Sequence, residues 1–324
     1  MIVSTFASRV NQSVAGDAAC LLSLPSTIAT EQEAITELAG RICYRSTEKM
    51  GHAPGFLRAR MAEGHLDIFE HVWITAVLMD EDETANWMQE HRYVWLTRNG
   101  QWCYISANMR VWMELAKINL IARDVLHQYL PKQIDGTIHA TATDVQPEQS
   151  EIINMPQAKV ADGALVNLVA CHRPKLPGGD DISSHQAATF LLQHVSRSLT
   201  HQLVRHRLLS FSQESQRYVS LEKGNWHPVL TPSIAESYRA VQITNQVWQA
   251  IETGYKELRA LGILREDARY LLPNATSTTI MVSGSIAAWK FMLKQRCAPD
   301  AQWEIRNVAL AIRDMLSELG MYHD

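Results

Sequence analysis

The sequence predicts an α+β fold in which a mixed or antiparallel sheet is flanked by long helices. Two patterns support this prediction. Short runs of apolar and β-branched residues, typical of buried strands, recur along the chain. Between and after these runs, apolar residues repeat at helical spacing, with capping residues in front and glycine behind. The strand-like runs cover residues 72–78, 164–171, 188–195 and 279–282.

The first part of the chain predicts a strand and a loop within residues 1–30, followed by a helix over 31–45. A shorter helix is expected over 54–63, ending at Gly64, because glycine readily takes the positive φ that closes a helix. Residues 80–187 differ in character, since they hold an acidic run, four tryptophans and much of the chain's proline and glycine. We interpret this block as an insertion of unassigned role, partly loop, in a catalytic domain made of residues 1–79 and 188–324.

The last part of the chain predicts three helices. Ser233 and Glu236 form a capping box, which predicts a helix that begins there and runs to about Gly262. A second helix is expected over about 286–295. Asp300 is a suitable N-cap for the third helix.

The composition is that of an ordinary globular protein, with 46% hydrophobic and 20% charged residues in 324. A net charge of −4 disfavours general nucleic-acid binding. The five cysteines lack CxxC spacing, which indicates reduced thiols and a cytoplasmic location. We expect neither a signal peptide nor a membrane span.

One stretch, residues 197–218, concentrates positive charge. It holds four arginines and two histidines against a single acid, Glu214. On a helix, Arg197, His201 and Arg205 form one stripe and the apolar residues form another. Beyond the helix, serines and glutamines follow, which suits a loop whose donors converge on an acceptor-rich ligand.

Arginine presents a planar set of donors that matches phosphate and carboxylate. The stretch therefore suggests an anion pocket, most simply for a nucleotide phosphate. On composition alone, a solvated basic helix face is an equally good interpretation. An RNA-binding surface is a third one, weakened because only Phe211 and Tyr218 provide aromatic rings.

The order of residues goes further than the composition. Arg205-His206-Arg207, seven residues and then Ser215 resemble the RHRx7S signature of the flavin-dependent thymidylate synthases (ThyX). Residues 64–71 resemble the GHxSxxEH segment of that family, and residues 268–273 and 301–306 resemble two later segments, in the family's order. The resemblance covers roughly 31–78 and 188–319, and implies a ThyX-like fold that carries the insertion as an added subdomain.

This resemblance implies that the chain methylates dUMP to dTMP. Methylenetetrahydrofolate would be the carbon donor, NADPH the reductant and FAD the cofactor. The enzyme would be a homotetramer with active sites shared between subunits, and its ligands would be small molecules, with no nucleic acid and no membrane. Two alternatives remain open: a flavin enzyme of the same fold that hydroxymethylates dUMP, and a nucleotide-binding homologue that has lost flavin chemistry.

The resemblance also implies roles for individual residues. Arg296 and Arg205 would be catalytic, since arginines near the uracil would stabilise charge as its C6 accepts hydride. The residues implied for dUMP binding are Gln202, Arg205, Ser215, Arg217, Arg269 and Arg296. The residues implied for FAD binding are His65, Arg205, His206, Arg207 and Gln213.

Two further interpretations concern polar residues that could suggest a catalytic nucleophile or a zinc site. Ser215 has no locally spaced base that would activate it as a nucleophile, so we expect it to hydrogen-bond dUMP. His65, Asp67, Glu70 and His71 fit no common zinc spacing, so we expect a hydrogen-bonded turn and no metal site.

The chain departs from the family at positions on the flavin side. Ser285, Ala287 and Phe291 stand where the family usually has Asn, then Arg, then His or Asn, and Asp67 replaces a small hydroxyl residue. The dUMP-side residues are intact. The departures predict weak flavin binding, unless Arg110 or Trp112 of the insertion supplies replacement contacts.

Overall fold

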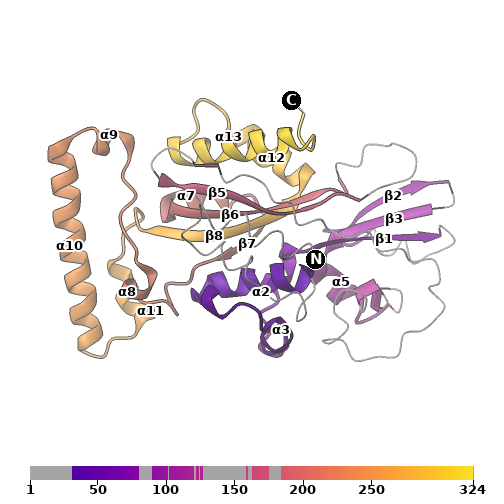
Figure 1. Cartoon of the computed structure of the whole chain (residues 1–324), viewed down its shortest axis with the longest axis horizontal. Helices are drawn as coiled ribbons and strands as arrows, with labels where there is room; N and C mark the ends of the chain where they lie inside the picture. Colours follow the sequence, from indigo (N-terminus) through magenta and orange to yellow (C-terminus); the bar gives the residue numbers. More distant parts are fainter. Residues whose placement is uncertain are drawn as a thin grey trace.

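Two antiparallel sheets form the framework of the protein (Figure 1). The computed structural model describes residues 31–79, 90–100, 102–119, 122–123, 125–126, 158–159, 163–174 and 184–323. The smaller sheet has the strand order β1 (Trp73–Met79), β3 (Trp102–Asn108) and β2 (Trp95–Asn99). The larger sheet has the order β4 (Ala158–Lys159), β5 (Leu165–His172), β6 (Ala187–Ser196), β8 (Ser277–Ser285) and β7 (Ser210–Gln213). The predicted α+β class is confirmed, and the strand predicted within 1–30 lies outside the described residues.

Helices pack on these sheets. Those that precede or follow the smaller sheet are α2 (Glu31–Tyr44), α3 (Ala53–Ala62), α5 (Met109–Leu115) and the short 3-10 helices η2 (Thr47–Lys49) and η3 (Asp67–His71). Later in the chain come α7 (Arg197–Leu203), α8 (Leu221–Gly224), α9 (Pro232–Ala235), α10 (Tyr238–Ala260), α11 (Arg265–Ala268), η5 (Arg269–Leu271), α12 (Ile286–Arg296) and α13 (Trp303–Glu318). No helix in the described ranges is long and apolar enough to cross a bilayer.

The central strands of the larger sheet are buried on both faces. Successive side chains of a strand point to opposite faces, so Phe190 and Leu192 of β6 join one core while Leu191 joins another. The first core is covered by α12 and α13, where Trp289 lies edge-on to Phe190 at a centroid distance of 5.2 Å. The second core includes Met281 of β8 and is covered by α2 and α3 (Figure 1).

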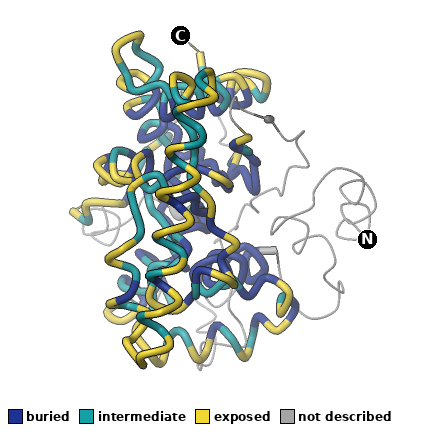
Figure 2. Tube along the Cα trace, turned by 90° about the vertical axis from the view of Figure 1, so that its left-hand side faces the viewer, coloured by how far each residue is buried: buried dark blue, intermediate teal, exposed yellow. Residues whose placement is uncertain are grey.

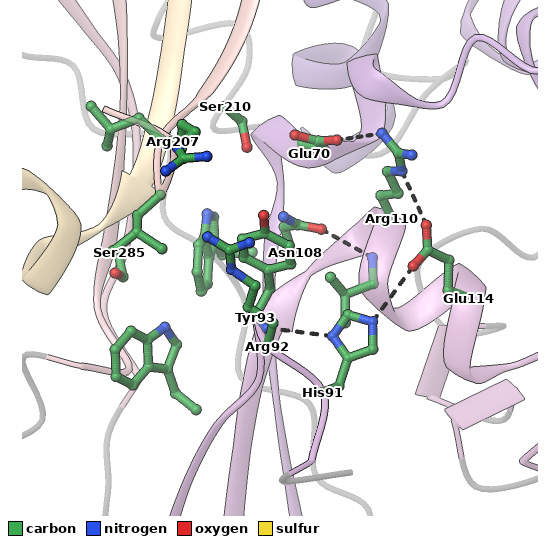
Figure 3. A pocket seen from close by; sticks show the side chains of 15 residues that line it. Glu70, His91, Arg92, Tyr93, Asn108, Arg110, Glu114, Arg207, Ser210 and Ser285 are labelled. Atoms are coloured by element: carbon green, nitrogen blue, oxygen red, sulfur yellow. Dashed lines mark hydrogen bonds and ion pairs between the residues drawn. The ribbon is translucent and has the colours of Figure 1, made fainter. Parts of the chain in front are cut away.

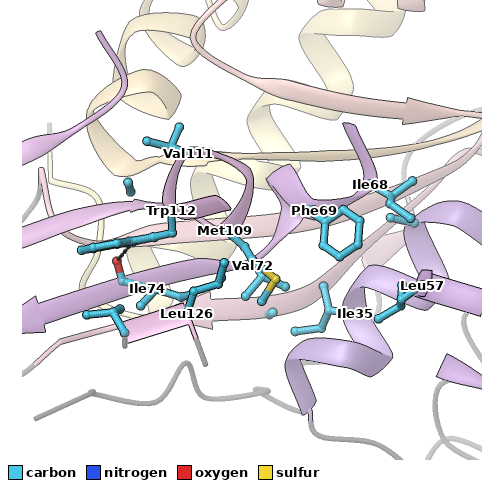
Figure 4. Packing of buried hydrophobic residues seen from close by; sticks show 14 of the residues in the cluster. Ile35, Leu57, Ile68, Phe69, Val72, Ile74, Met109, Val111, Trp112 and Leu126 are labelled. Atoms are coloured by element: carbon cyan, nitrogen blue, oxygen red, sulfur yellow. Dashed lines mark hydrogen bonds between the residues drawn. The ribbon is translucent and has the colours of Figure 1, made fainter. Parts of the chain in front are cut away.

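The second core extends from the larger sheet into the smaller one (Figure 4). Trp112 of α5 is fully buried there, and its indole N–H donates to the carbonyl of Ile74 at 3.2 Å. Phe69, which precedes β1, is fully buried in the same cluster. The hypothesis that Trp112 contacts a ligand is therefore wrong, because its ring belongs to the core.

The described strands between residues 80 and 187 take part in both sheets. β3 pairs with β1 along its whole length, from Asn108 opposite Trp73 to Trp102 opposite Met79. β5 pairs with β6 in the same antiparallel manner. The proposed boundaries of the insertion therefore coincide with no break in either sheet, and the division of the chain into domains stays a prediction.

Residues 210–213, predicted as part of a loop, form the edge strand β7. Phe211 pairs with Val282 of β8, and Ser212 is buried. A serine-rich run lacks the apolar alternation of a typical strand. Its backbone pairing with the strongly apolar β8 determines the conformation instead.

Two helix starts also differ from the predictions. The helix expected from Ser233 to Gly262 is divided, because Thr231 caps the short α9 and Ser237 caps α10 through a bond from the Ala240 amide at 3.3 Å. The last helix begins at Trp303 and is capped by the Gln302 side chain rather than by Asp300.

A buried chain of hydrogen bonds joins the two sheets. Thr75 of β1 contacts Ser106 of β3 at 2.5 Å and Nε2 of His172 at 2.6 Å. Ser106 also contacts Nδ1 of His185 at 2.8 Å, and Nε2 of His185 contacts Thr97 of β2 at 2.8 Å. Burial lowers the pKa of His172 to about 3 and that of His185 to about 4, so both rings are neutral links at pH 7.

A third buried histidine lies on the face of the larger sheet that carries the second core, next to the edge strand β7. Nδ1 of His71 contacts the Ser283 hydroxyl at 2.6 Å, and Nε2 contacts the Ser212 hydroxyl at 2.9 Å. The Thr189 hydroxyl contacts Ser283 at 2.7 Å and donates to the His71 carbonyl at 3.1 Å. Burial lowers the pKa of His71 to about 3.

Replacing Thr75 by valine should destabilise the protein by roughly 2–4 kcal/mol, because two buried polar groups lose a partner while the side-chain shape is kept. Urea unfolding would measure this change in the free energy of unfolding. Thr75→Ser is the control, since it keeps the hydroxyl and removes only a methyl group. Equal stability of the two variants would show that the hydrogen-bond chain contributes nothing.

His71, His172 and His185 should make stability depend on pH between about 6.5 and 4. The unfolded chain binds protons in this range while the folded rings do not, so the free energy of unfolding falls as pH falls. Each histidine should contribute about 1 kcal/mol per pH unit. Urea unfolding of wild type and His172→Gln at several pH values should give a shallower slope in the variant, and equal slopes would contradict the assignment for His172.

Candidate functional site

The cationic stretch begins where β6 ends. Ser196 caps α7, and its hydroxyl accepts from the Leu199 amide at 3.0 Å. Glu304 of α13 accepts from both the Ser196 amide at 2.7 Å and its hydroxyl at 2.5 Å, which fixes the start of the helix. Leu199 is buried while His201 and Arg205 are exposed, so the cationic side of α7 faces away from the core as predicted.

Three predicted site residues meet where α7 and α12 end. Nε of Arg296 donates to Nε2 of His206 at 2.9 Å, and Nη2 donates to the Gln202 carbonyl at 3.3 Å. The Gln202 side chain donates to Gln302 at 3.5 Å. The Phe291 ring lies edge-on to His206 at 6.3 Å. A guanidinium is well placed at this position, because the C-terminus of a helix carries partial negative charge.

His206 is buried and neutral. Burial, and then the positive charge of Arg296, lower its pKa to about 4. Because Nε2 accepts from Arg296, the ring proton stands on Nδ1.

A second group of predicted residues follows β7 in the chain and meets at Glu266 of α11. Nε of Arg217 donates to the Glu266 carboxylate at 2.8 Å, and Nε of Arg269 donates to the Glu266 carbonyl at 3.0 Å. The Arg217 guanidinium also lies over the Tyr218 ring at 5.3 Å. The Ser215 hydroxyl accepts from the Arg217 amide at 3.2 Å, so it supports this loop.

His65 reaches the second group through two tyrosines. Its Nδ1 lies 3.0 Å from the Tyr44 hydroxyl, which also accepts from Nη1 of Arg60 at 2.9 Å. The Tyr44 ring in turn lies 5.1 Å from the Tyr218 ring. The structure therefore links His65 to Arg217 through Tyr44 and Tyr218, although 151 residues lie between them in the chain.

The predictions missed a cluster of charges between these groups. Nη2 of Arg197 donates to the Glu214 carbonyl, and Nη1 of Arg45 lies 3.1 Å from the Glu214 carboxylate. Burial lowers the pKa of Arg197 to about 10; the nearby Glu214 opposes this effect and Arg269 adds to it. Nε of Arg197 is buried without a hydrogen-bond partner among the described residues.

Two of the residues implied for FAD have different surroundings. The Gln213 amide donates to the Thr200 hydroxyl at 3.0 Å, so part of its capacity is used within the protein. Arg207 is exposed and lines a cavity of about 400 Å³ (Figure 3). Ser210 and Ser285 lie on the same side of this cavity as Arg207.

The opposite side of the cavity comes from η3, β1, β2, β3, α5 and the turn before β2. Nη1 of Arg110 donates to Glu70 at 2.6 Å and its Nε donates to Glu114 at 3.2 Å (Figure 3). The residues on this side are Glu70, Trp73, His91, Arg92, Tyr93, Trp95, Asn108, Arg110, Val111 and Glu114.

The flavin-side departures have distinct environments. The Ser285 hydroxyl accepts from the Ala288 amide at 3.2 Å and caps α12. Phe291 is 56% exposed beside His206. Asp67 lies near Cys43, whose thiol pKa is raised to about 12 by burial and then by the Asp67 charge. Weak flavin binding stays a prediction.

The two groups of predicted residues remain separate within one chain. Among the described residues, no hydrogen bond or ion pair joins Arg296, His206 and Gln202 to the group around Arg217 and Arg269. The described residues also include no group of three or more His, Cys, Asp or Glu side chains that could hold a metal ion.

Comparison with known proteins gives a family. The family model described as "Thymidylate synthase complementing protein" matches residues 126–319, more than half of the 324-residue chain. The chain belongs to this family. The match includes β5, β6, β7, β8 and the helices α7 and α12 that carry the first group of site residues.

Several relatives in this family carry the name "Flavin-dependent thymidylate synthase". The protein from Nitratidesulfovibrio vulgaris is 39% identical over 147 residues, which is 42% of this chain and 59% of the relative. The protein from Geobacter sulfurreducens is 37% identical over 133 residues, or 41% of this chain and 57% of the relative. The chain thus matches somewhat less than two thirds of the length of these two proteins.

The tautomer of His206 can be tested by NMR of ¹⁵N-histidine-labelled protein. Nε2 should give the resonance of an unprotonated ring nitrogen throughout pH 5.5–8, because its pKa is lowered to about 4. Arg296→Met removes the donor and one positive charge, so the His206 pKa should rise while burial still holds it below the ordinary value. Titration of wild-type His206 near pH 6.5 would contradict this arrangement.

Proposed function

We propose that this chain is an FAD-dependent thymidylate synthase. It methylates dUMP to dTMP, with methylenetetrahydrofolate as carbon donor and NADPH as reductant. One observation carries the proposal. Arg296 contacts both Gln202 and His206, the central residue of the Arg-His-Arg segment, in a member of the thymidylate synthase complementing protein family. The relatives named flavin-dependent thymidylate synthase support the flavin dependence.

The proposed dUMP site uses the two groups for different parts of the nucleotide. Arg217, Arg269 and Ser215 offer a guanidinium-rich surface for the phosphate, where bidentate donors bind strongly. Gln202, Arg205 and Arg296 would bind the uracil side. Arg205 is exposed, so its guanidinium is available to a ligand.

The proposed catalytic role of Arg205 and Arg296 is electrostatic. When the uracil ring accepts hydride, negative charge develops on it, and fixed guanidinium groups lower the energy of that state. Arg296 is already oriented by His206 and the Gln202 carbonyl, so little reorganisation is needed. Ser215 serves as a binding group, consistent with its place in the Arg217 loop.

FAD, when bound, supplies the hydride transfer that no side chain can perform. The proposed flavin contacts are His65, Arg205, His206, Arg207 and Gln213. The chemistry of this set fits a ligand that has both phosphate groups and an aromatic ring. Arg207 is an exposed cation at a cavity, and His206 is a neutral, oriented imidazole.

We also propose a homotetramer with shared active sites. The two residue groups are separate within one chain, which suits a site completed by a second subunit. In α10 only Trp248 and Tyr255 are buried, while Ile243 and Val247 are 47% and 53% exposed (Figure 2). Such an apolar helix face is typical of a protein interface. We also propose a cytoplasmic location, because the cysteines are scattered along the sequence without CxxC spacing.

The function can be tested with the purified protein. Its absorbance spectrum with and without added FAD reports flavin binding, and NADPH oxidation should then depend on dUMP and methylenetetrahydrofolate. The mass of the product separates methylation from hydroxymethylation. Absence of dUMP-dependent oxidation in FAD-loaded protein would favour a nucleotide-binding homologue without flavin chemistry.

Arg217→Ala should weaken dUMP binding, because the phosphate loses a hydrogen bond from a charged group. The corresponding increase in Kd is about 10- to 150-fold and is measurable by calorimetry. Glu266→Gln is the matched control, because it releases Arg217 from its exposed partner and keeps the guanidinium. Its dUMP affinity should be equal to or higher than that of wild type, whereas unchanged affinity in Arg217→Ala would remove Arg217 from the site.

A further inference from the structure

The cavity in Figure 3 combines a wall inside the family match with a wall outside it. Arg207, Ser210 and Ser285 lie within residues 126–319, which the family model matches. The residues of the opposite wall, from Glu70 to Glu114, all precede that range. The second wall therefore lies outside the matched range, and its residues from His91 to Glu114 also lie outside the stretches that resemble the family. It faces Ser285, a position where the chain departs from the family pattern.

Of the three arginines that line the cavity, Arg110 forms ion pairs with acidic residues and the other two form none with any described residue. Arg110 is balanced by Glu70 and Glu114, and Glu114 also lies 3.5 Å from Nε2 of His91. Arg92 and Arg207 are exposed and form no ion pair with any described residue. Two guanidinium groups on opposite walls are thus left for an anion, and arginine binds phosphate oxygens with two parallel hydrogen bonds.

One aromatic ring lies beside Arg92, and two others line the cavity. Tyr93 is 37% exposed and its ring lies 5.3 Å from the Arg92 guanidinium carbon. Trp73 and Trp95 also line the cavity. Rings of this kind stack on nucleotide bases, and such stacking tolerates any base because every base presents a flat face. The cavity volume of about 400 Å³ lies in the ordinary range for small-molecule sites.

We propose that this cavity binds the adenosine diphosphate moiety of a dinucleotide. Arg92 and Arg207 bind the diphosphate, and Tyr93, Trp73 and Trp95 contact the adenosine. The choice of a dinucleotide rests on the proposed function, since FAD and NADPH both contain this moiety. On this assignment, the segment around Arg92 replaces contacts that Ser285, Ala287 and Phe291 no longer supply.

The first experiment is a calorimetric titration of ADP into the full chain. Arg92→Ala should raise the Kd for ADP at least ten-fold, and Arg92→Lys should recover part of the loss because it keeps the charge. Arg58→Ala is the matched control: Arg58 is exposed on α3 and does not line the cavity, so ADP affinity should be that of wild type. No ADP binding to wild type, or equal Kd values in Arg92→Ala and Arg58→Ala, would overturn the proposal.

A second experiment identifies the source of the moiety. ADP should compete with FAD or with NADPH, and the dinucleotide that uses the cavity should lose affinity in Arg92→Ala. FMN, which lacks adenosine, should bind equally to Arg92→Ala and wild type. If ADP displaces neither dinucleotide, the assignment to a dinucleotide is wrong.

These results are independent of catalysis. Loss of ADP binding in Arg92→Ala, in a protein that forms no dTMP, would refute the proposed function and support the cavity assignment. If the protein forms dTMP and Arg92→Ala leaves the Kd for ADP unchanged, the proposed function is supported and the cavity assignment is refuted.

Discussion

The antiparallel pairing of β6 with β8 is the constraint on which the candidate site depends. Each strand leads directly into a helix, β6 into α7 and β8 into α12. Because the strands run in opposite directions, the two helices start at opposite ends of the sheet and pack on the same core. Their C-terminal ends therefore meet, and Arg296 reaches His206 and the last turn of α7.

This pairing also explains why two hydroxyl side chains, Thr189 and Ser283, are buried side by side in the sheet. On β6 and β8, Thr189 and Ser283 occupy positions whose neighbours along the strand face the apolar core. Left unpaired, these hydroxyls would be costly to bury. His71 and Ser212 complete their hydrogen bonds, which links η3 and the edge strand β7 to the centre of the sheet.

The sequence predicted those parts of the fold whose signal is local. Apolar runs located β1, β5, β6 and β8, and Gly64 ended α3 with a φ of +76°. β7 was missed because Ser210 and Ser212 have no strand-like pattern of their own, and the pairing partner decides their conformation. The α9–α10 boundary was missed because Ser233 and Ser237 are both acceptable caps, and only packing chooses between them.

The candidate site also has a part that a local motif predicts and a part that only the fold brings together. The Arg205-His206-Arg207 motif identified the first group, and the distance from His206 to Arg296 then followed from the fold rather than from any spacing. Arg45 and Glu214 pair across 169 residues, and no local pattern predicts such a contact. The cavity segment near Arg92 carries no motif, so its meeting with Arg207 became visible only in three dimensions.

The hydrogen-bond chain between the sheets has a direction. Each hydroxyl in it can donate once to a neighbour, and the neutral His185 ring has one N–H and one acceptor nitrogen. If Nε2 of His172 accepts from Thr75, then every bond from Thr97 onward points toward His172, because each hydroxyl has only one proton to donate. If Nε2 donates, the Thr75 proton is released for Ser106, and all four hydrogen bonds as far as Thr97, on the far strand of the smaller sheet, can reverse.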